Sequence, residues 1–212
     1  MAISKTAKSK VITGLCGGKV AFLGASGAWE GPESFDYLTS LSLKNQVSTT
    51  DQYADDKRIY RKLSDAGIEG EIGTTSQDIG FEQKSGYLIE ADGGLLAEIK
   101  ARGAKPCCFY FEHTRVDAAT ETEYKVKTWL INCHINKATE ETHDTDTDKP
   151  SFAAYKYPIV VDGENMKAAS GDTDAVDENG FEICVYKVIS CPGDTGYATF
   201  GDAVPAIKQK GK

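Results

Sequence analysis

Apolar and polar residues alternate along much of this chain, which is the pattern of strands with one buried face. The alternation begins at Val11-Ile12 and returns after a glycine-rich break, and at Leu41 and Leu43 it places two leucines on one face. Strands are therefore expected over residues 19–24, 35–48, 58–63, 68–75, 107–114, 124–136, 151–161 and 181–191.

Two short segments depart from this alternation. Thr75 and Asp78 resemble a capping box and Gly86 suits a helix stop, so a helix is expected over residues 76–84. Residues 92–103 fit either a helical turn or a hairpin, and the Gly93-Gly94 pair favours a hairpin into the strand at 107–114. One helix among about ten strands predicts a mainly β fold, a two-sheet antiparallel β-sandwich with one flanking α-helix.

The longest predicted hairpin runs from Tyr124 to Val161. Its first strand changes phase, because Tyr124 and Val126 share one parity and the later apolar residues take the other. One extra residue in a bulge near Lys127 would reconcile the two halves. The apolar residues of the second parity are Trp129, Ile131, Cys133 and Ile135.

The tip of this hairpin, residues 138–150, is acidic and rich in threonine. A long hairpin with a charged tip is suited to contacts with a neighbouring molecule, so the sequence predicts a self-assembling structural protein. The candidate residues for a contact between subunits are the five carboxylates Glu140, Glu141, Asp144, Asp146 and Asp148.

The 212 residues fit one domain with arms. We expect an N-terminal arm over residues 1–10, a sandwich over 11–191 and a C-terminal arm over 192–212. No apolar run reaches the roughly 18 residues that cross a bilayer, and the N-terminus lacks an apolar core of signal-peptide length. Six cysteines without a CxxC pair predict buried thiols in a protein that folds in a reducing cytoplasm.

The net charge of −8 arises mostly from residues 139–182, where 12 acidic and 3 basic residues give −9. Tight binding of nucleic acid requires a basic patch, which an acidic net charge of this kind does not favour. An acidic surface is compatible with nucleic acid that slides past without sticking, and equally with a solvated acidic loop.

Candidate chemistry is sparse. The acidic run at Asp144 does not fit a calcium loop, because Lys149 stands where the loop needs glycine and Tyr155 where it needs glutamate. His113 and His134 fall in strands and could face each other, but two ligands make a poor metal site. No GxSxG, HExxH or Walker sequence occurs. We therefore expect no enzyme, no catalytic residue, no metal and no cofactor.

Short motifs in a fixed order resemble the major tail protein, or tail tube protein, of long-tailed siphophages that infect Gram-positive hosts. They span residues 11–161, and the resemblance thins after about residue 165. The motifs are VITGL at 11–15, QYADDK at 52–57, DIGFE at 78–82, SGY at 85–87, FYFE at 109–112, KTWL at 127–130 and DTDKP at 146–150.

The resemblance implies a sandwich whose copies form six-membered rings that stack into a tube, through which DNA passes into the host. Residues 76–84 would be the flanking helix, and residues 138–150 a subunit or ring contact. It further implies a virion tail location after assembly in the host cytoplasm, and tape measure, distal tail and tail terminator proteins as partners. The alternatives are a non-enzymatic β-sandwich binding module or adhesin, another tube or tail-terminator component, and a cupin-like metal enzyme.

Overall fold

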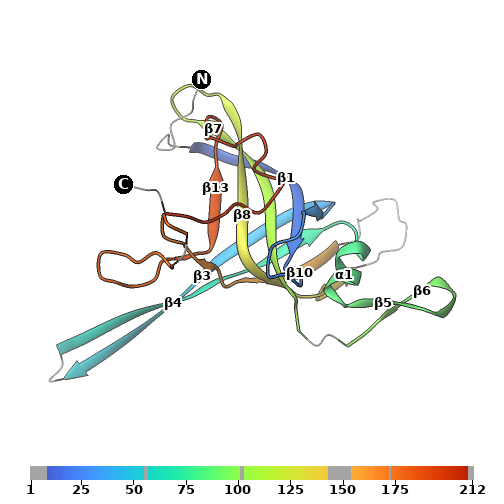
Figure 1. The fold of residues 1–212 in the computed structure, drawn as a ribbon, viewed down its shortest axis with the longest axis horizontal. Coiled ribbons are helices and arrows are strands. Elements are labelled where there is room, and N and C mark those ends of the chain that lie inside the picture. The colour runs from blue at the N-terminus through green and yellow to red at the C-terminus, as the bar shows by residue number, and fades with distance from the viewer. Residues whose placement is uncertain (1–8, 55–56, 101–102, 143–153, 172, 210–212) are drawn as a thin grey trace.

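The computed structural model describes residues 9–54, 57–100, 103–142, 154–171 and 173–209. Its largest sheet is antiparallel, in the order β2-β1-β7-β8-β10-β4-β3, with β13 paired to β8 and β9 paired to β10 (Figure 1). The strands are β1 (Ser9–Phe22), β2 (Glu33–Ser34), β3 (Leu38–Ala54), β4 (Lys57–Thr74), β7 (Pro106–Asp117), β8 (Glu123–Ile135), β9 (Glu140–Thr142), β10 (Ala154–Val161) and β13 (Lys187–Ser190).

Two small sheets and one α-helix complete the described elements. The small sheets pair β5 (Leu88–Ala91) with β6 (Leu95–Glu98), and β11 (Glu164–Asn165) with β12 (Cys184–Val185). A 3-10 turn, η1 (Asp92–Gly94), joins β5 to β6, and the α-helix is α1 (Ile79–Ser85). The mainly β class with one helix, a β-sandwich in architecture, is confirmed.

The main core lies between the layer of β1, β7 and β8 and the layer of β4 and β10. The two layers are joined where the end of β8, Cys133–Ile135, pairs with β10. Aromatic rings pack edge to face in this core. The ring centroid of Phe35 lies 5.7 Å from that of Phe109 and 5.6 Å from that of Tyr157. Leu41 and Leu43 pack against the same cluster, as their spacing predicted.

The phase change in β8 has a different position from the predicted one. Lys127 pairs in register with Glu112, so the bulge expected near Lys127 is wrong. The register shift falls between the pairs Cys107–Cys133 and Phe109–Leu130, where Asn132 adopts a positive φ of 50°. Residues of the same parity therefore face opposite sides of the sheet before and after Asn132. Trp129 and Ile131, which precede it, belong to a second apolar cluster, whereas Cys133 and Ile135, which follow it, belong to the main core.

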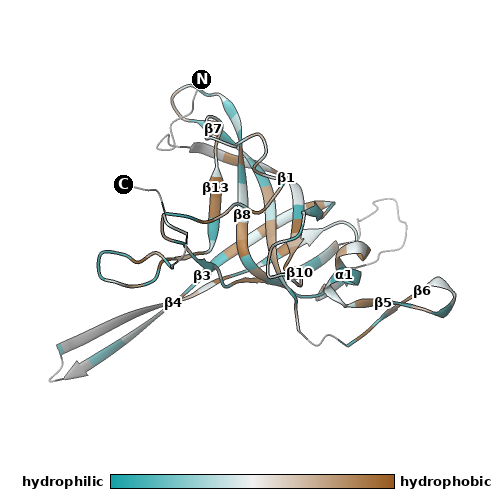
Figure 2. Ribbon diagram, viewed as in Figure 1, coloured by the Kyte–Doolittle hydropathy of each residue, from teal (hydrophilic) through white to brown (hydrophobic). Residues whose placement is uncertain are grey.

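The C-terminal segment covers that second cluster. We expected an arm over residues 192–212, but residues 192–209 lie against the outer face of β7 and β8. Phe200, Val204 and Ile207 pack on the cluster, and Figure 2 shows the hydrophobic residues of β8 and β13 beside this segment. The expected strand over 181–191 is reduced to β12 and β13. Of the expected N-terminal arm, only residues 9–10 are described, and they open β1.

Glycine and capping residues predicted the position of the helix and of the turn at Gly93-Gly94. Gly86 ends α1 in the left-handed conformation, as predicted, with φ 81°. The N-cap is Asp78 rather than Thr75, because the Asp78 Oδ1 accepts a 2.9 Å hydrogen bond from the Phe81 N–H. The hairpin expected at Gly93-Gly94 forms, with both glycines at positive φ, but it joins β5 to β6. The strand at 107–114, expected as its partner, is part of β7 and pairs with β1 and β8 instead.

Candidate assembly surface

The longest hairpin of the structure is formed by β3 and β4, which pair from Leu38–Thr74 to Ala54–Lys57. It projects well beyond the body of the subunit (Figure 1). Only the base of this hairpin is attached to the body, because β10 pairs with β4 from Ile68 to Thr74. Beyond Val47, which is 49% exposed, each strand extends about eight residues, or roughly 25 Å.

This distal part, residues 47–65, is named here the β3–β4 arm. Within the described part of the chain, its two strands pair only with each other, so both outer edges carry unpaired backbone groups. An isolated two-stranded hairpin is marginally stable in water, and unpaired edges favour addition of another chain. The β3–β4 arm is therefore a candidate surface for contact with another chain.

The acidic loop predicted as the contact lies elsewhere. Glu140 and Glu141 fall in β9, which pairs with the first residues of β10. The Tyr155 hydroxyl donates a 3.3 Å hydrogen bond to Glu141 Oε1. Asp144, Asp146 and Asp148 lie outside the described residues. The expected long hairpin of 124–161 is also modest, since β8 and β10 pair over three residues only.

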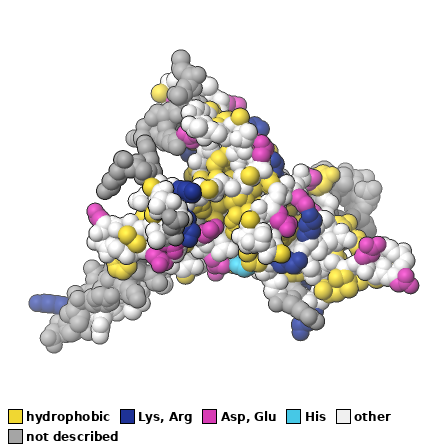
Figure 3. All heavy atoms as spheres, in the orientation of Figure 1, with side chains coloured by type: hydrophobic (Ala, Val, Ile, Leu, Met, Phe, Trp, Pro, Cys, Tyr) yellow, Lys and Arg dark blue, Asp and Glu magenta, His cyan; other side chains and the backbone are white. Residues whose placement is uncertain are grey.

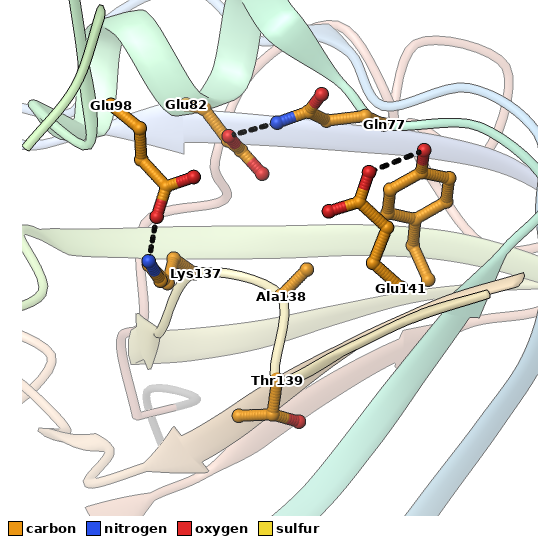
Figure 4. Close-up of a pocket in the computed structure, with 8 residues that line it drawn as sticks. Gln77, Glu82, Glu98, Lys137, Ala138, Thr139 and Glu141 are labelled. Carbon is orange, nitrogen blue, oxygen red and sulfur yellow. Dashed lines mark hydrogen bonds and ion pairs between the residues drawn. The ribbon is translucent and has the colours of Figure 1, made fainter. Parts of the chain in front are cut away.

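Glu141 also lines a polar pocket of about 300 Å³ at the junction of β9, β10 and α1 (Figure 4). Figure 4 shows the side chains of Glu82, Glu98 and Glu141 around it, with Lys137 paired to Glu98. Its lining residues are Gln77, Glu82, Glu98, Lys137, Ala138, Thr139, Glu141 and Tyr155.

The buried carboxylate of this pocket, Glu82, has a structural role. Glu82 accepts hydrogen bonds from Gln77 Nε2 at 2.7 Å and from the Tyr157 hydroxyl at 3.1 Å. The same hydroxyl accepts a bond from the Asp78 N–H at 3.2 Å, and burial raises the pKa of Tyr157. Glu82 thus fixes the start of α1 to β10, because its carboxylate accepts hydrogen bonds from Gln77, just before the helix, and from Tyr157 of β10.

The histidines singled out from the sequence are bonded locally and do not face each other. His113 pairs with Val126 and accepts a 2.9 Å bond from Arg115 Nε, while His134 pairs with Pro106 and lies 3.3 Å from Asp162 Oδ2. No group of three or more His, Cys, Asp or Glu side chains able to hold a metal ion occurs among the residues that the structure describes.

The adjacent cysteines occupy the two faces of β7. Cys107 lies in the main core and Cys108 in the second cluster, and burial raises the pKa of each thiol to about 12. Cys133 is buried too, but Cys16 and Cys191 are half-buried and Cys184 is exposed, so the prediction of buried thiols holds for three of the six.

Comparison with known proteins gives no match, either among protein-family models or among curated proteins. None of the described helices is long and apolar enough to cross a membrane.

Proposed function

We propose that this chain is a structural subunit that assembles with copies of itself into the tail tube of a long-tailed bacteriophage. The observation that carries the proposal is the β3–β4 arm, whose outer strand edges pair with no other strand within the described part of the chain. Pairing with a neighbouring copy would satisfy those edges and stabilise a hairpin that is marginal alone.

The remaining features fit a passive conduit. The described side chains form no metal cluster, and the buried Glu82 is engaged in holding the fold. A subunit with net charge −8 repels a DNA backbone, so DNA passes through such a tube without specific binding. Six-membered rings, a virion tail location and contacts with tape measure, distal tail and tail terminator proteins are proposed from the sequence resemblance.

The test is negative-stain electron microscopy of the purified chain at low and high concentration, with its mass measured in solution. Stacked rings or hollow tubes support the proposal. Failure of the intact chain to form either at any concentration overturns self-assembly of the purified protein, and adhesin or enzyme functions then regain weight.

A variant in which a short Gly-Ser turn replaces residues 47–64 tests the β3–β4 arm. We expect a folded monomer that forms no tubes, because the paired base of the hairpin remains. Replacing residues 140–148 in the same way tests the acidic loop separately. Tubes from the first variant would show that the arm is not the assembly element.

A further inference from the structure

A groove lies between β1 and β3, near the two edges of the large sheet. The strands touch at one end, where an added Cβ atom on Gly18 would lie 2.6 Å from Cδ1 of Leu38. Beyond this contact they leave a cavity of about 550 Å³, which a second cavity of about 250 Å³ continues past Leu15. The two cavities together are named here the β1–β3 groove. The lining residues of the larger cavity are Ile12, Thr13, Gly14, Leu15, Thr39, Ser40, Leu41, Leu43, Phe111, His113 and Arg115.

Both walls of the groove are strands with one open edge. Residues 12–17 of β1 pair with β7 along one edge, and residues 38–45 of β3 pair with β4 along one edge. No backbone hydrogen bond joins the two walls within the part of the chain that the structure describes. The N–H and C=O groups of the other two edges therefore remain available to an extended backbone placed between them.

The floor of the groove is apolar. Leu15, Leu41 and Leu43 line it and also pack on the main core. Two exposed apolar residues stand toward its ends, Ile12 at 61% and Tyr37 at 68% exposure. Tyr37 has a positive φ of 62°, a strained conformation of the kind that gathers at binding surfaces. An apolar floor between open strand edges is the arrangement by which a sheet takes up an extended peptide.

The groove accepts one strand and excludes the edge of a folded sheet. Paired strands lie about 4.8 Å apart, and an inserted strand would have β1 on one side and β3 on the other. The edge strand of another sheet carries its own neighbour at the same spacing, which would collide with one of these walls. Every strand that the structure describes is already paired along at least one edge. The described part of a second copy therefore offers no strand with both edges free.

The charges that line the groove are one cation and one carboxylate, toward opposite ends. Arg115 Nε donates to His113 Nε2 at 2.9 Å, and no carboxylate pairs with Arg115 in the described structure, so its terminal N–H groups can bind an acidic group. Asp36 is exposed at the other end. Figure 3 shows acidic and basic side chains interspersed over the face that it presents, so net charge alone singles out no partner there.

We propose that the β1–β3 groove binds a single extended segment of another polypeptide by strand addition. The segment carries apolar residues at alternate positions, an acidic group near Arg115 and a basic group near Asp36. Its backbone pairs with β1 and β3, and its inward side chains cover the leucines of the floor. The site lies outside the β3–β4 arm, and the proposal does not depend on the tube function.

A defined peptide tests the site. The probe is fluorescein-labelled Glu-Val-Thr-Val-Thr-Val-Lys, about 23 Å long when extended, and the reversed order of the same residues covers the opposite chain direction. We expect one of the two to bind the purified chain in fluorescence anisotropy. Methylation of alternate backbone nitrogens removes the donors of one edge and should weaken that binding at least about tenfold. Failure of both probes to bind, or equal binding of the methylated form, would overturn the proposal.

A matched pair of substitutions locates the bound probe. Ile12→Asp alters an exposed wall residue, so the subunit should fold and bind the probe at least about tenfold more weakly. Ile189→Asp alters an exposed isoleucine of β13, outside the groove, and should leave the affinity within about twofold. Amide hydrogen exchange gives a second readout, since residues 12–17 and 38–45 should gain protection on binding. Protection gained only in residues 47–65 would place the peptide on the β3–β4 arm and overturn the groove as its site.

Charge and self-association complete the test. Arg115→Gln should weaken the probe and should have little effect on a variant probe with Gln in place of Glu. If the probe converts self-associated chains into monomers, the occupant is a second copy, and the assignment to another polypeptide is overturned. If the native chain forms tubes but neither probe binds, the groove proposal fails and the tube function stands. If a probe binds but no tubes form, the groove stands and the tube function fails.

Discussion

The indole Nε1–H of Trp129 donates a 2.8 Å hydrogen bond to the carbonyl oxygen of Phe200. Trp129 is fully buried in the second cluster, and Phe200 belongs to a segment that has no strand or helix. Lys127 Nζ reinforces the attachment by donating to the carbonyl oxygens of Tyr197 at 2.9 Å and Ala198 at 3.1 Å. Side chains of β8 therefore hold the C-terminal segment through its backbone.

Trp129→Phe should lower the free energy of unfolding by about 1–3 kcal/mol. The substitution leaves the Phe200 carbonyl without its donor and opens a small cavity in a closely packed cluster. Urea denaturation followed by circular dichroism measures the change. Trp29→Phe is the control, since Trp29 packs on the same cluster and no hydrogen bond of its indole is seen among the described residues. An equal loss in both variants would contradict the role of the Phe200 bond.

His113 should make the protein less stable in mild acid. Burial, and then the charges of Arg115 and Lys187, lower the pKa of His113 below 6.5, its ordinary value. The unfolded chain then binds a proton at a higher pH than the folded chain does. Stability is therefore fully present above about pH 6.5 and falls as the pH drops toward the folded-state pKa.

His113→Phe should remove that part of the pH dependence in urea denaturation between pH 7 and pH 5. The ring can keep its stacking with Phe111, and the buried Nδ1, which has no hydrogen-bond partner in the described structure, is eliminated. His134→Gln controls for the loss of a histidine and must keep the His113 contribution. An unchanged slope in His113→Phe would show that another group causes the acid sensitivity.

Short-range signals predicted those elements whose geometry is fixed by neighbours in sequence. Gly86 ended the helix and Gly93-Gly94 formed the hairpin, because these positions need backbone angles that glycine adopts readily. Alternation also placed Leu41 and Leu43 toward the core, since it reports which face of a strand is covered.

Alternation does not report which strands pair, and for that reason the sequence did not predict the β3–β4 arm as the candidate assembly surface. Residues 58–63 and 68–75 read as two strands, with Ser64–Gly67 as the break between them. They form one strand, β4, which continues through a positive φ at Gly67. The acidic residues favoured residues 138–150 as the contact between subunits. The long projecting hairpin is instead β3–β4, which precedes α1.

Tyr157→Phe should lower the free energy of unfolding by about 1–3 kcal/mol. Its hydroxyl joins the Asp78 N–H to the buried Glu82 carboxylate, and removing it leaves a buried acceptor with one bond fewer. Thermal and urea denaturation at pH 7 measure the loss. Tyr124→Phe should change stability by less than about 0.5 kcal/mol, because no partner of the Tyr124 hydroxyl is found within the described ranges. A similar loss in both would remove Tyr157 as the anchor of α1.

Gly70→Ala should disrupt the attachment of the β3–β4 arm. A Cβ atom at Gly70 would lie 2.1 Å from the Ser42 carbonyl oxygen on β3, and backbone on an adjacent strand cannot move aside without losing its pairing. We expect a loss of more than about 3 kcal/mol in the free energy of unfolding, or a subunit whose β3–β4 amides exchange rapidly with solvent.

Gly80→Ala is the matched control, because its Cβ would lie 3.6 Å from the nearest atom, on the exposed side of α1. Alanine favours a helix over glycine, so this variant should be unchanged or more stable by up to about 1 kcal/mol. Hydrogen exchange resolved by residue separates local from global effects. Native protection of residues 38–74 in Gly70→Ala would mean that the close approach of β3 and β4 does not hold the arm, and its base would then have to be sought in the β4–β10 pairing.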